Sequence, residues 1–461
     1  MIRRGREMTP EVAEKKSRFM YWWLLVAIFF EYARPASYIK PLGAVPLNST
    51  LPMLLLVVTC FAGGLRPVTE IFKDRMARWP LAYLFFILSS MAWAVVTTRA
   101  YTVFTLTLGY VFLFWMIVRI VTTEERLRGM FLVLIISHLF LLAMNPEVVL
   151  DPNNRNYIKG ASFLGDGNDY SLSLCILMPL AMVLALHSHG MKRVFYWGVM
   201  GIVLLAIIAT QSRGATLGIG AVFGYLWLQS SRKALGVVAI LLALLVVLIY
   251  APPVYFQRMG TIANYEGESS AEGRIEAWKA GARMAANNVL GVGAGNFPNS
   301  FPKYRGQDAP ARWMTAHSMY FLILGELGIL GLLLLVKLIF GNVRANRELY
   351  REISKDATGP PRKSPGKLPV APEVSPELKR AQTILHFMTA SMLGFAVAGA
   401  FLSVAYYPHI FVMTGLMVSA RTILATRLGV DLGTLWAPSR KGRPVRSKAR
   451  HGEQPAAPTP G

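Results

Sequence analysis

Arg213 is the first residue whose position suggests chemistry. It stands in the sequence Thr210–Gly214 (TQSRG), which joins two long apolar runs by an extremely short turn. A guanidinium at such a boundary either extends toward water or forms an anion site that faces a lipid-linked phosphate. The turn alone leaves both interpretations open.

Arg274 lies in a second polar segment, Ser269–Met284, which has the pattern of a helix. Ser269 and Glu272 have the spacing of a capping box, and Arg274 and Trp278 are one turn apart, so they share a face. The segment is either an interfacial amphipathic helix with Trp278 at the level of the lipid headgroups, or a helix that directs Arg274 into a cavity.

Glycines follow this segment in two groups. The sequence Gly291–Phe297 (GVGAGNF) predicts turns, because it lacks the lysine and the preceding strand of a phosphate-binding loop. The glycines at positions 325, 328 and 331 line one stripe of a later apolar helix. Small residues in such a stripe predict close helix packing.

Two of the seven histidines, His317 and His409, fall at the membrane boundary that we expect to face outward. His317 opens an apolar helix, and Glu326 lies about 13 Å deeper on it at 1.5 Å per residue. A carboxylate inside a membrane is costly and usually paired, which favours a structural role for Glu326 over direct chemistry. His138 lies in mid-span, a position typical of a helix–helix hydrogen bond. Arg213, Arg274 and His317 therefore come from three segments of one expected face.

Long apolar helices must position these residues, because the composition excludes a soluble enzyme with a single core. The chain of 461 residues is 54% hydrophobic and 16% charged, with a mean hydropathy of +0.42, against roughly 25% charged residues in an average soluble domain. Charge-free runs repeatedly reach the roughly 20 residues that cross a bilayer. The two cysteines, Cys60 and Cys175, lie inside apolar runs, which excludes a disulfide scaffold. We predict an all-α polytopic membrane protein.

The apolar runs predict about 12 transmembrane helices, and the basic residues orient them. The expected spans are 19–39, 42–63, 80–98, 101–121, 127–144, 169–187, 194–212, 214–230, 234–252, 316–342, 381–405 and 408–427. With a cytoplasmic N-terminus, most of the 48 Lys and Arg residues fall on cytoplasmic segments, as the positive-inside rule requires. The net charge of +23 is therefore mainly a topology signal, with contact to anionic lipids as an addition, rather than a nucleic-acid footprint. We expect both termini in the cytoplasm and the first span as an uncleaved anchor.

This topology divides the chain into six expected parts. They are a cytoplasmic basic N-terminus (1–18), an N-terminal transmembrane bundle (19–193), a core with the catalytic candidates (194–345) that includes a large outer loop (253–315), a cytoplasmic disordered linker (346–380), a C-terminal transmembrane pair (381–427) and a cytoplasmic basic disordered tail (428–461). The linker and the tail are rich in proline and basic residues, a composition that cannot bury apolar surface.

Residues of roughly 195–345 resemble the O-antigen ligase and polymerase superfamily of bacterial membrane glycosyltransferases. The resemblance rests on Ser212-Arg213-Gly214, on Arg274 followed by Trp278, on Gly291–Phe297, and on His317 followed by Glu326 and its glycines. The segment Gly165–Tyr170 (GDGNDY) is similar to an outer loop of the family, and Glu31–Pro35 (EYARP) is similar to the branch called O-glycosylation ligases. Where the family often has asparagine after the histidine, this chain has Ser318.

The resemblance implies a GT-C-like membrane fold and a reaction on the periplasmic side of the bacterial inner membrane. Members transfer a glycan from an undecaprenyl pyrophosphate donor to the hydroxyl of a lipid- or protein-borne acceptor, and they need no metal, nucleotide or other cofactor. The sequence shows no His/Cys/Asp cluster with the spacing of metal ligands. We therefore expect a metal-independent, inverting glycosyltransferase whose partners are the donor, the acceptor and membrane lipids, with no nucleic acid.

The same resemblance assigns roles to the candidate residues. Arg213 and Arg274 would bind the donor pyrophosphate and stabilise the charge that grows on this leaving group. His317 would act as the base or would orient the acceptor, since a histidine with a pKa of about 6.5 can accept a proton at neutral pH. Tyr320 would line the cleft one turn below, and Trp278 would contribute to substrate binding.

A lipid-linked glycan flippase or another transporter is the alternative from a different class. Transport favours repeats and discontinuous spans with ionisable groups near the midplane, and only His138 and Glu326 fit that description. A transporter would not require a long capped outer loop. A structural membrane scaffold, a third class, would leave the outer arginines and histidine unused. The acceptor stays open, because the lipid A core, a second lipid-linked glycan in a polymerase, and a protein Ser or Thr all present a hydroxyl.

Overall fold

The computed structural model describes residues 10–44, 54, 59, 65–154, 157–260, 269–307, 314–355 and 375–436, and all regular elements within them are helical. In chain order the elements are α1 (Pro10–Ala33), η1 (Pro35–Ser37), η2 (Lys40–Ala44), α3 (Val68–Ile71), α4 (Trp79–Ser89), η3 (Ser90–Ala92), α5 (Thr97–Ile120), α6 (Glu124–Met144), α7 (Glu147–Leu150), α8 (Gly167–Leu186), α9 (Gly190–Ala209), α10 (Arg213–Gln229), α11 (Lys233–Tyr250), α12 (Pro253–Gly260), α13 (Ser269–Asn287), α14 (Phe297–Tyr304), α15 (Met319–Lys355), α16 (Pro376–Ala398), η5 (Gly399–Phe401), α17 (Pro408–Arg427) and α18 (Leu432–Leu435).

Eight of the described helices are long and apolar enough to cross a membrane, in agreement with a polytopic α-helical membrane protein. These helices are α5, α6, α8, α9, α11, α15, α16 and α17. The helices α4, with 11 residues, and α10, with 17, are shorter than the roughly 20 residues of a straight span. Cys60 and most of the span expected over 42–63 lie outside the described residues. The count of twelve spans therefore stays a prediction.

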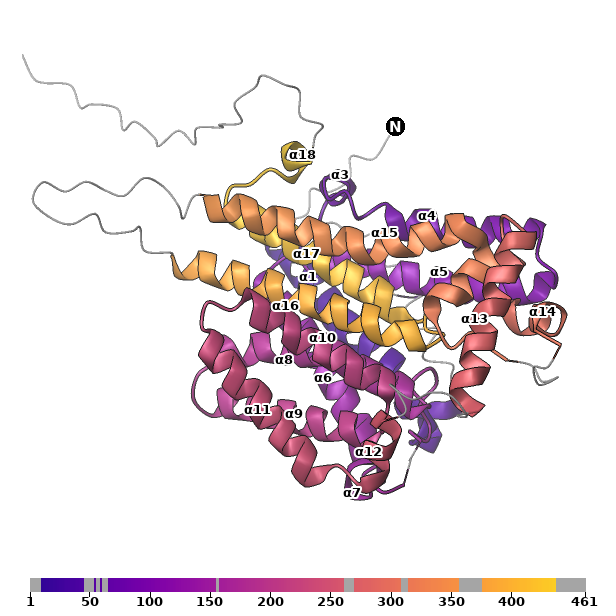
Figure 1. Ribbon diagram of the computed structural model, residues 1–461. Coiled ribbons are helices and arrows are strands. Elements are labelled where there is room, and N and C mark those ends of the chain that lie inside the picture. The colour runs from indigo at the N-terminus through magenta and orange to yellow at the C-terminus, as the bar shows by residue number, and fades with distance from the viewer. Residues whose placement is uncertain are drawn as a thin grey trace, which may run out of the picture.

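Burial separates the centre of the helix bundle from its edge. In the apolar windows of α17 and α8, 94% and 83% of the residues are buried, whereas the window of α11 has none. Helix α8 packs against α6, α9, α10 and α16, and α17 packs against α5, α15 and α16. Helix α11 lies at the rim (Figure 1). Because α11 is apolar on all sides, its exposed surface is suited to lipid.

A buried ion pair fastens α17 to the residues before α4. Arg421 is fully buried, and its Nε donates to Asp74 Oδ2 over 2.6 Å. Its other nitrogens donate to Asn346 Oδ1 at 2.7 Å and to Asn342 Oδ1 at 2.9 Å, both on α15. A buried charge is tolerated when it is both paired and hydrogen-bonded. The cluster therefore holds α15, α17 and the turn around Asp74 together.

The expected disordered linker is helical in its first part. Helix α15 continues beyond the expected span end at 342 for roughly three and a half turns and reaches Lys355. Ion pairs along this end, such as the 2.8 Å contact between Arg344 Nε and Glu348 Oε1, join residues four apart on one face. Residues 356–374, the rest of the segment before α16, lie outside the described residues.

The expected tail also begins with ordered structure. Helix α18 follows α17, and the ring of Trp436 lies 5.3 Å from the guanidinium carbon of Arg75. This geometry is that of a cation–π contact, so the start of the tail packs against the turn that carries Asp74. The remainder, 437–461, lies outside the described residues.

The long segment 253–315 contains three described helices, α12, α13 and α14, where the sequence predicted one. Helix α13 packs against α15 and α14. In the view of Figure 1, α13 and α14 lie beside one end of the long helices, and α12 lies below them. The capping box expected at the start of α13 depends on the Ser269 side chain, which lies outside the described side chains.

Candidate functional site

Arg213 is the first residue of α10, and the turn before it is fixed by side-chain hydrogen bonds. Ser212 is the N-cap, and its Oγ accepts from the backbone N of Ala215 at 3.4 Å. Gln211 has a left-handed φ of 52°, and its side-chain amide donates to the carbonyl oxygen of Pro152 over 2.9 Å. A helix N-terminus carries partial positive charge. The short turn therefore places the guanidinium where the backbone also favours an anion.

A small cavity, which we call the arginine cavity, brings Arg213 together with Arg274 and with a third arginine, Arg258. They come from α10, α13 and the last turn of α12, respectively. The other lining residues are Asn168, Ser212, Gly214, Phe401 and Leu402. None of these described lining residues is acidic. Three cations around one space create a positive potential that attracts anions, and guanidinium groups match the geometry of phosphate oxygens.

Arg258, Asn168, Phe401 and Leu402 line the cavity but were not assigned to the site from the sequence, and of these Arg258 and Asn168 are polar. The only sequence signal for Arg258 is a basic residue two positions after an apolar run that ends at Phe256. Asn168 belongs to the GDGNDY motif, and its backbone N and side-chain Nδ2 both donate to Asp166 Oδ1, at 2.7 and 2.8 Å. Asp166 is also the N-cap of α8. The cap therefore fixes the position of the Asn168 amide at the edge of the cavity.

The arginine cavity is nearly closed in this conformation. Its volume of about 10 Å³ admits at most one water molecule. Arg213, Arg258 and Arg274 are each only partly buried, and arginine side chains have several rotatable bonds. A ligand as large as a pyrophosphate therefore requires these side chains to move apart.

Trp278 lies one turn after Arg274 on α13 and holds the chain that precedes α15. Its indole Nε1 donates to the carbonyl oxygen of Ala316 over 3.0 Å. The ring stacks on Phe321 with centroids 5.4 Å apart and an interplanar angle of 8°, and it lies 6.4 Å from the ring of Phe401. Since Phe401 also lines the arginine cavity, Trp278 forms a link between that cavity and the residues around position 316. Its role in substrate binding stays a prediction.

His317 lies immediately before α15 and is not among the residues that line the arginine cavity. It is partly buried and has a left-handed φ of 46°, a conformation that costs about 1–3 kcal/mol for a residue other than glycine. Such strain clusters at functional sites. Two residues earlier, Thr315 Oγ1 lies 2.8 Å from Ser403 Oγ. The chain around His317 thus packs beside Leu402, which is a lining residue of the cavity.

Tyr320, in the first turn of α15, uses its hydroxyl to join two helices. The hydroxyl donates to the carbonyl oxygen of Ala396 on α16 over 3.0 Å. The structure therefore brings Arg213 and Arg274 to one cavity, places His317 on a neighbouring segment, and assigns the Tyr320 hydroxyl to helix packing. That Tyr320 lines a substrate cleft stays a prediction.

Glu326 is buried on α15, and its carboxylate accepts three hydrogen bonds. Oε1 accepts from the backbone N of Phe297 at 2.8 Å. Oε2 accepts from the backbone N of Gly295 and from the hydroxyl of Tyr406, both at 2.7 Å. The structural pairing predicted for this carboxylate is therefore confirmed. It ties the GVGAGNF segment and the chain before α17 to α15.

Gly291 and Gly328 allow these two segments to approach at backbone distance. Both have a left-handed φ, 75° at Gly291 and 62° at Gly328. A Cβ on Gly328 would lie 2.0 Å from the carbonyl oxygen of Val289, and one on Gly291 would lie 2.4 Å from that of Glu326. These distances are too short for any side chain, and Gly328 also breaks the helical geometry within α15. The glycine motifs are therefore two halves of one structural contact.

Two buried histidines share one serine inside the bundle. His138 Nε2 lies 2.6 Å from Ser173 Oγ, and His409 Nε2 lies 2.8 Å from the same oxygen. The helix–helix hydrogen bond predicted for His138 is confirmed, because Ser173 belongs to α8. His409, which was expected at the outer boundary, lies in the first turn of α17, and only 2% of its surface is exposed. It lies within the packed core, since α17 is surrounded by neighbours.

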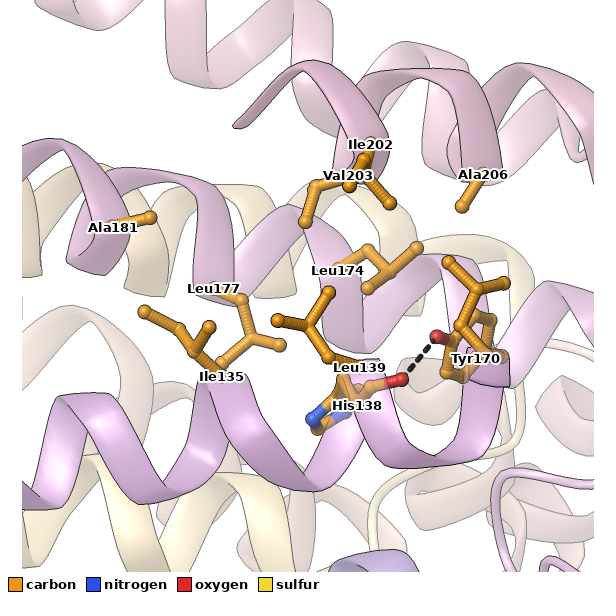
Figure 2. A pocket seen from close by; sticks show the side chains of 11 residues that line it. Ile135, His138, Leu139, Tyr170, Leu174, Leu177, Ala181, Ile202, Val203 and Ala206 are labelled. Atoms are coloured by element: carbon orange, nitrogen blue, oxygen red, sulfur yellow. Dashed lines mark hydrogen bonds between the residues drawn. The ribbon is translucent and has the colours of Figure 1, made fainter. Parts of the chain in front are cut away.

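The gap beside His138 is a feature of helix packing. Figure 2 shows it between α6, α8 and α9, lined by apolar side chains, with the Tyr170 hydroxyl directed toward the backbone oxygen of His138. That hydrogen bond measures 2.9 Å, and the volume of the gap is about 10 Å³. A space of this size and apolar character offers no anion site.

Comparison with known families adds one finding. Residues 198–336 match the family model described as O-antigen ligase, which supports the resemblance to the O-antigen ligase superfamily that the motifs indicated. The matched region contains Arg213, Arg258, Arg274, His317 and Glu326. No curated protein matches the chain significantly.

Proposed function

Since residues 198–336 match the O-antigen ligase family, we propose that this protein is a membrane glycosyltransferase that acts at the arginine cavity. Its donor is a glycan on undecaprenyl pyrophosphate, and its acceptor is a hydroxyl of a lipid-borne or protein-borne molecule. The single observation that carries the proposal is the convergence of Arg213, Arg258 and Arg274 on one cavity. All three arginines lie within the matched region.

The arginines would bind and stabilise the leaving group. The donor's sugar–oxygen bond breaks, and its electron pair passes to the pyrophosphate oxygen. Negative charge on that oxygen grows toward the transition state, so fixed guanidinium groups lower the barrier more than they strengthen ground-state binding. Bidentate hydrogen bonds from arginine also fix the orientation of the phosphates. Opening of the closed cavity would be part of donor binding.

His317 would handle the acceptor. In an inverting displacement, the acceptor oxygen attacks the anomeric carbon on the face opposite the pyrophosphate, and the acceptor proton passes to a base. His317 is the candidate that the family resemblance indicates, and its segment packs beside Phe401 and Leu402 of the cavity through Trp278 and Thr315. It acts either as this base or as a residue that orients the hydroxyl. Neither the arginines nor His317 require a metal in this scheme.

The proposal fixes an orientation in the membrane. The arginine cavity and helices α12–α14 face the periplasm, the fold is GT-C-like, and both termini lie in the cytoplasm of a bacterial cell. The excess of basic residues on the segments expected inside supports this orientation. A reporter fused near Asn299 should then report periplasm, and one fused at Lys367 or after His451 should report cytoplasm. An external signal at Lys367 would overturn the orientation.

The experiment that tests the function is direct transfer. The purified full chain is incubated with an undecaprenyl-pyrophosphate glycan and, separately, with lipid A core, a second lipid-linked glycan, and a Ser/Thr-containing acceptor protein. A glycosylated product with release of undecaprenyl pyrophosphate in one arm supports the proposal and identifies the acceptor class. Movement of the lipid-linked glycan across a vesicle membrane, without any product in the three arms, would favour the transporter alternative.

A further inference from the structure

A second cavity lies at the opposite end of the same helices. Its polar lining includes Tyr225 and Gln229 on α10, Arg347, Tyr350 and Arg351 on α15, and His386 on α16. We call it the far-end cavity. Its volume is about 140 Å³, roughly ten times the space that admits one water. Along α15, Arg347 lies roughly 40 Å from the start of the helix, so this cavity is separate from the arginine cavity.

The charges around the far-end cavity favour an anion. Arg347 and Arg351 are one turn apart on α15 and therefore share a face, and none of the described lining residues is acidic. Other basic residues on this end of α15 are paired within the described chain, as Arg344 is with Glu348. The two lining arginines form no ion pair with any described residue. Exposed guanidinium groups beside a cavity supply both charge and a bidentate fork for phosphate oxygens.

The polar wall of this cavity is already fixed by contacts with the bundle. The hydroxyl of Tyr225 lies 3.3 Å from His386 Nδ1, and the ring centroids of Tyr350 and His386 are 4.3 Å apart. Asn346, another lining residue, accepts from the buried Arg421 at 2.7 Å. These contacts hold hydrogen-bonding groups in place before any ligand arrives. In contrast to the arginine cavity, this space needs no opening to admit a phosphate.

The location of the cavity is typical of a site for lipid headgroups. The cavity lies between α10, α15 and α16, near the ends of α10 and α15, and two tyrosines line it. Tyrosines are enriched at the boundary between lipid tails and water, and basic pockets between membrane helices bind anionic lipid headgroups. A free phosphate anion has the same charge and the same oxygen geometry. Both sources therefore share the chemistry that this site would recognise.

We propose that the far-end cavity binds the phosphate group of an anionic ligand through Arg347 and Arg351. This site requires no glycan transfer, so it stands or fails independently of the proposed function. A phosphate bound here would bridge α10, α15 and α16 at the end opposite the arginine cavity.

Native mass spectrometry of the purified, delipidated full chain tests the proposal. The probes are phosphatidylglycerol, phosphatidylcholine and inorganic phosphate, and the measured quantity is the apparent Kd of each. The double substitution Arg347→Gln/Arg351→Gln should weaken phosphatidylglycerol binding about 30-fold, because each basic residue near the membrane surface contributes about 1 kcal/mol. Arg344→Gln is the matched control, since Arg344 lies on the same helix end but is paired with Glu348 and does not line the cavity. It should leave binding within twofold.

The other outcomes distinguish a lipid headgroup from a free phosphate and define the results that would overturn the proposal. Binding of phosphatidylglycerol that inorganic phosphate does not displace identifies a lipid headgroup, whereas displacement at similar concentrations identifies a free phosphate. Equal binding by the wild-type chain and the double variant would overturn the proposal, and so would an equal loss in Arg344→Gln. If the double variant does not fold, the single substitutions Arg347→Gln and Arg351→Gln should each weaken binding about fivefold, and the absence of any loss in both overturns the site.

Discussion

The hydroxyl of Tyr406 donates a hydrogen bond to Glu326 Oε2 over 2.7 Å, although the two residues are 80 positions apart in the sequence. The same carboxylate accepts from the backbone N of Gly295 and Phe297. One buried side chain therefore joins α15, the glycine-rich segment before α14 and the chain before α17. Because α13 and α15 carry or adjoin the candidate residues, this contact contributes to the geometry of the site from a distance.

Substitution of this carboxylate is expected to lower stability. Glu326→Gln removes one of the acceptor oxygens, so a buried backbone N–H loses its partner at a cost of about 1–3 kcal/mol. Thermal unfolding of the purified protein in detergent, followed by intrinsic fluorescence, should show a lower Tm. Glu352→Gln is the control, since Glu352 pairs with Lys355 at the exposed end of α15. An unchanged Tm combined with lost transfer would instead make Glu326 a catalytic carboxylate.

The three arginines should each be required for transfer. Removal of one stabilising donor at a site of developing charge typically reduces turnover by roughly 10²–10³, so Arg213→Ala, Arg258→Ala and Arg274→Ala should each show a loss of this size with little change in the yield of folded protein. Lysine at these positions should restore only part of the rate, because a point charge lacks the bidentate fork. Transfer is measured as product per folded enzyme.

Lys279→Ala provides the matched control for the arginine variants. Lys279 is a cation on α13 that is exposed and does not line the arginine cavity. It should retain full activity. Full activity in all three arginine variants would contradict the mechanism and return the transporter alternative to the front.

Glycan transfer should depend on the imidazole ring of His317, which can both hydrogen-bond and accept a proton. His317→Ala should lower transfer by roughly 10²–10⁴, the range for loss of a general base. His317→Gln separates two roles, because an amide can orient a hydroxyl but cannot accept its proton at neutral pH. Substantial activity in the glutamine variant would leave only the orienting role. The measurement is kcat and KM for the acceptor.

The choice of control histidine follows from burial. His409 is unsuitable as a control, because it is buried against Ser173 and several aromatic rings, so His409→Ala should lower stability. His189 is exposed at the start of α9. His189→Ala should leave both activity and Tm unchanged, and a loss equal to that of His317→Ala would remove His317 from the site.

The buried pair Arg421–Asp74 should dominate the stability of its region. Arg421→Ala or Asp74→Ala leaves the other charge buried without compensation, at a cost of about 3–5 kcal/mol. The double substitution should cost less than the two single losses added together, because no uncompensated charge remains. Tm values of the four proteins in the cycle measure this coupling. Additive losses would show that the pair does not interact energetically.

Acid should loosen the contact between α13 and the chain after α14. Burial raises the pKa of Glu276, but hydrogen bonds from Arg283 and from the backbone N of Gly306 outweigh it, so the pKa lies below its ordinary value of 4.5. A lowered pKa in the folded state means that Glu276 stabilises this contact above about pH 4.5 and that the contribution is lost as the pH falls through the folded pKa.

Hydrogen exchange measured by mass spectrometry across this pH range checks that expectation. After correction for intrinsic exchange rates, peptides of residues 269–307 should lose protection below pH 4.5 in the wild-type chain. Glu276→Gln should show reduced protection already at neutral pH and little further pH dependence. Identical pH profiles in the two proteins would show that another group controls the region.

Local sequence determined the features that depend on neighbours along the chain. The apolar runs of about 20 residues specify membrane helices, because backbone polar groups can be satisfied inside a helix without any tertiary partner. The TQSRG turn places Arg213 at a helix start, and the helical spacing of Arg274 and Trp278 is seen in α13. The motifs around Arg213, Arg274, His317 and Glu326 also indicated the superfamily that residues 198–336 match.

Tertiary structure decided which of these side chains meet. Arg258 joins the arginine cavity because α12 packs near α10, and the partner of Glu326 is a tyrosine 80 residues away. The indole N–H of Trp278 donates to the carbonyl oxygen of Ala316, 38 positions away, a partner that helical spacing does not indicate. Hydrogen bonds and cavities form between segments that are far apart in the sequence. The number of residues between two segments does not determine their distance in the folded protein. Periodicity therefore predicts a helix and its apolar face, whereas partners across the bundle depend on how the helices pack.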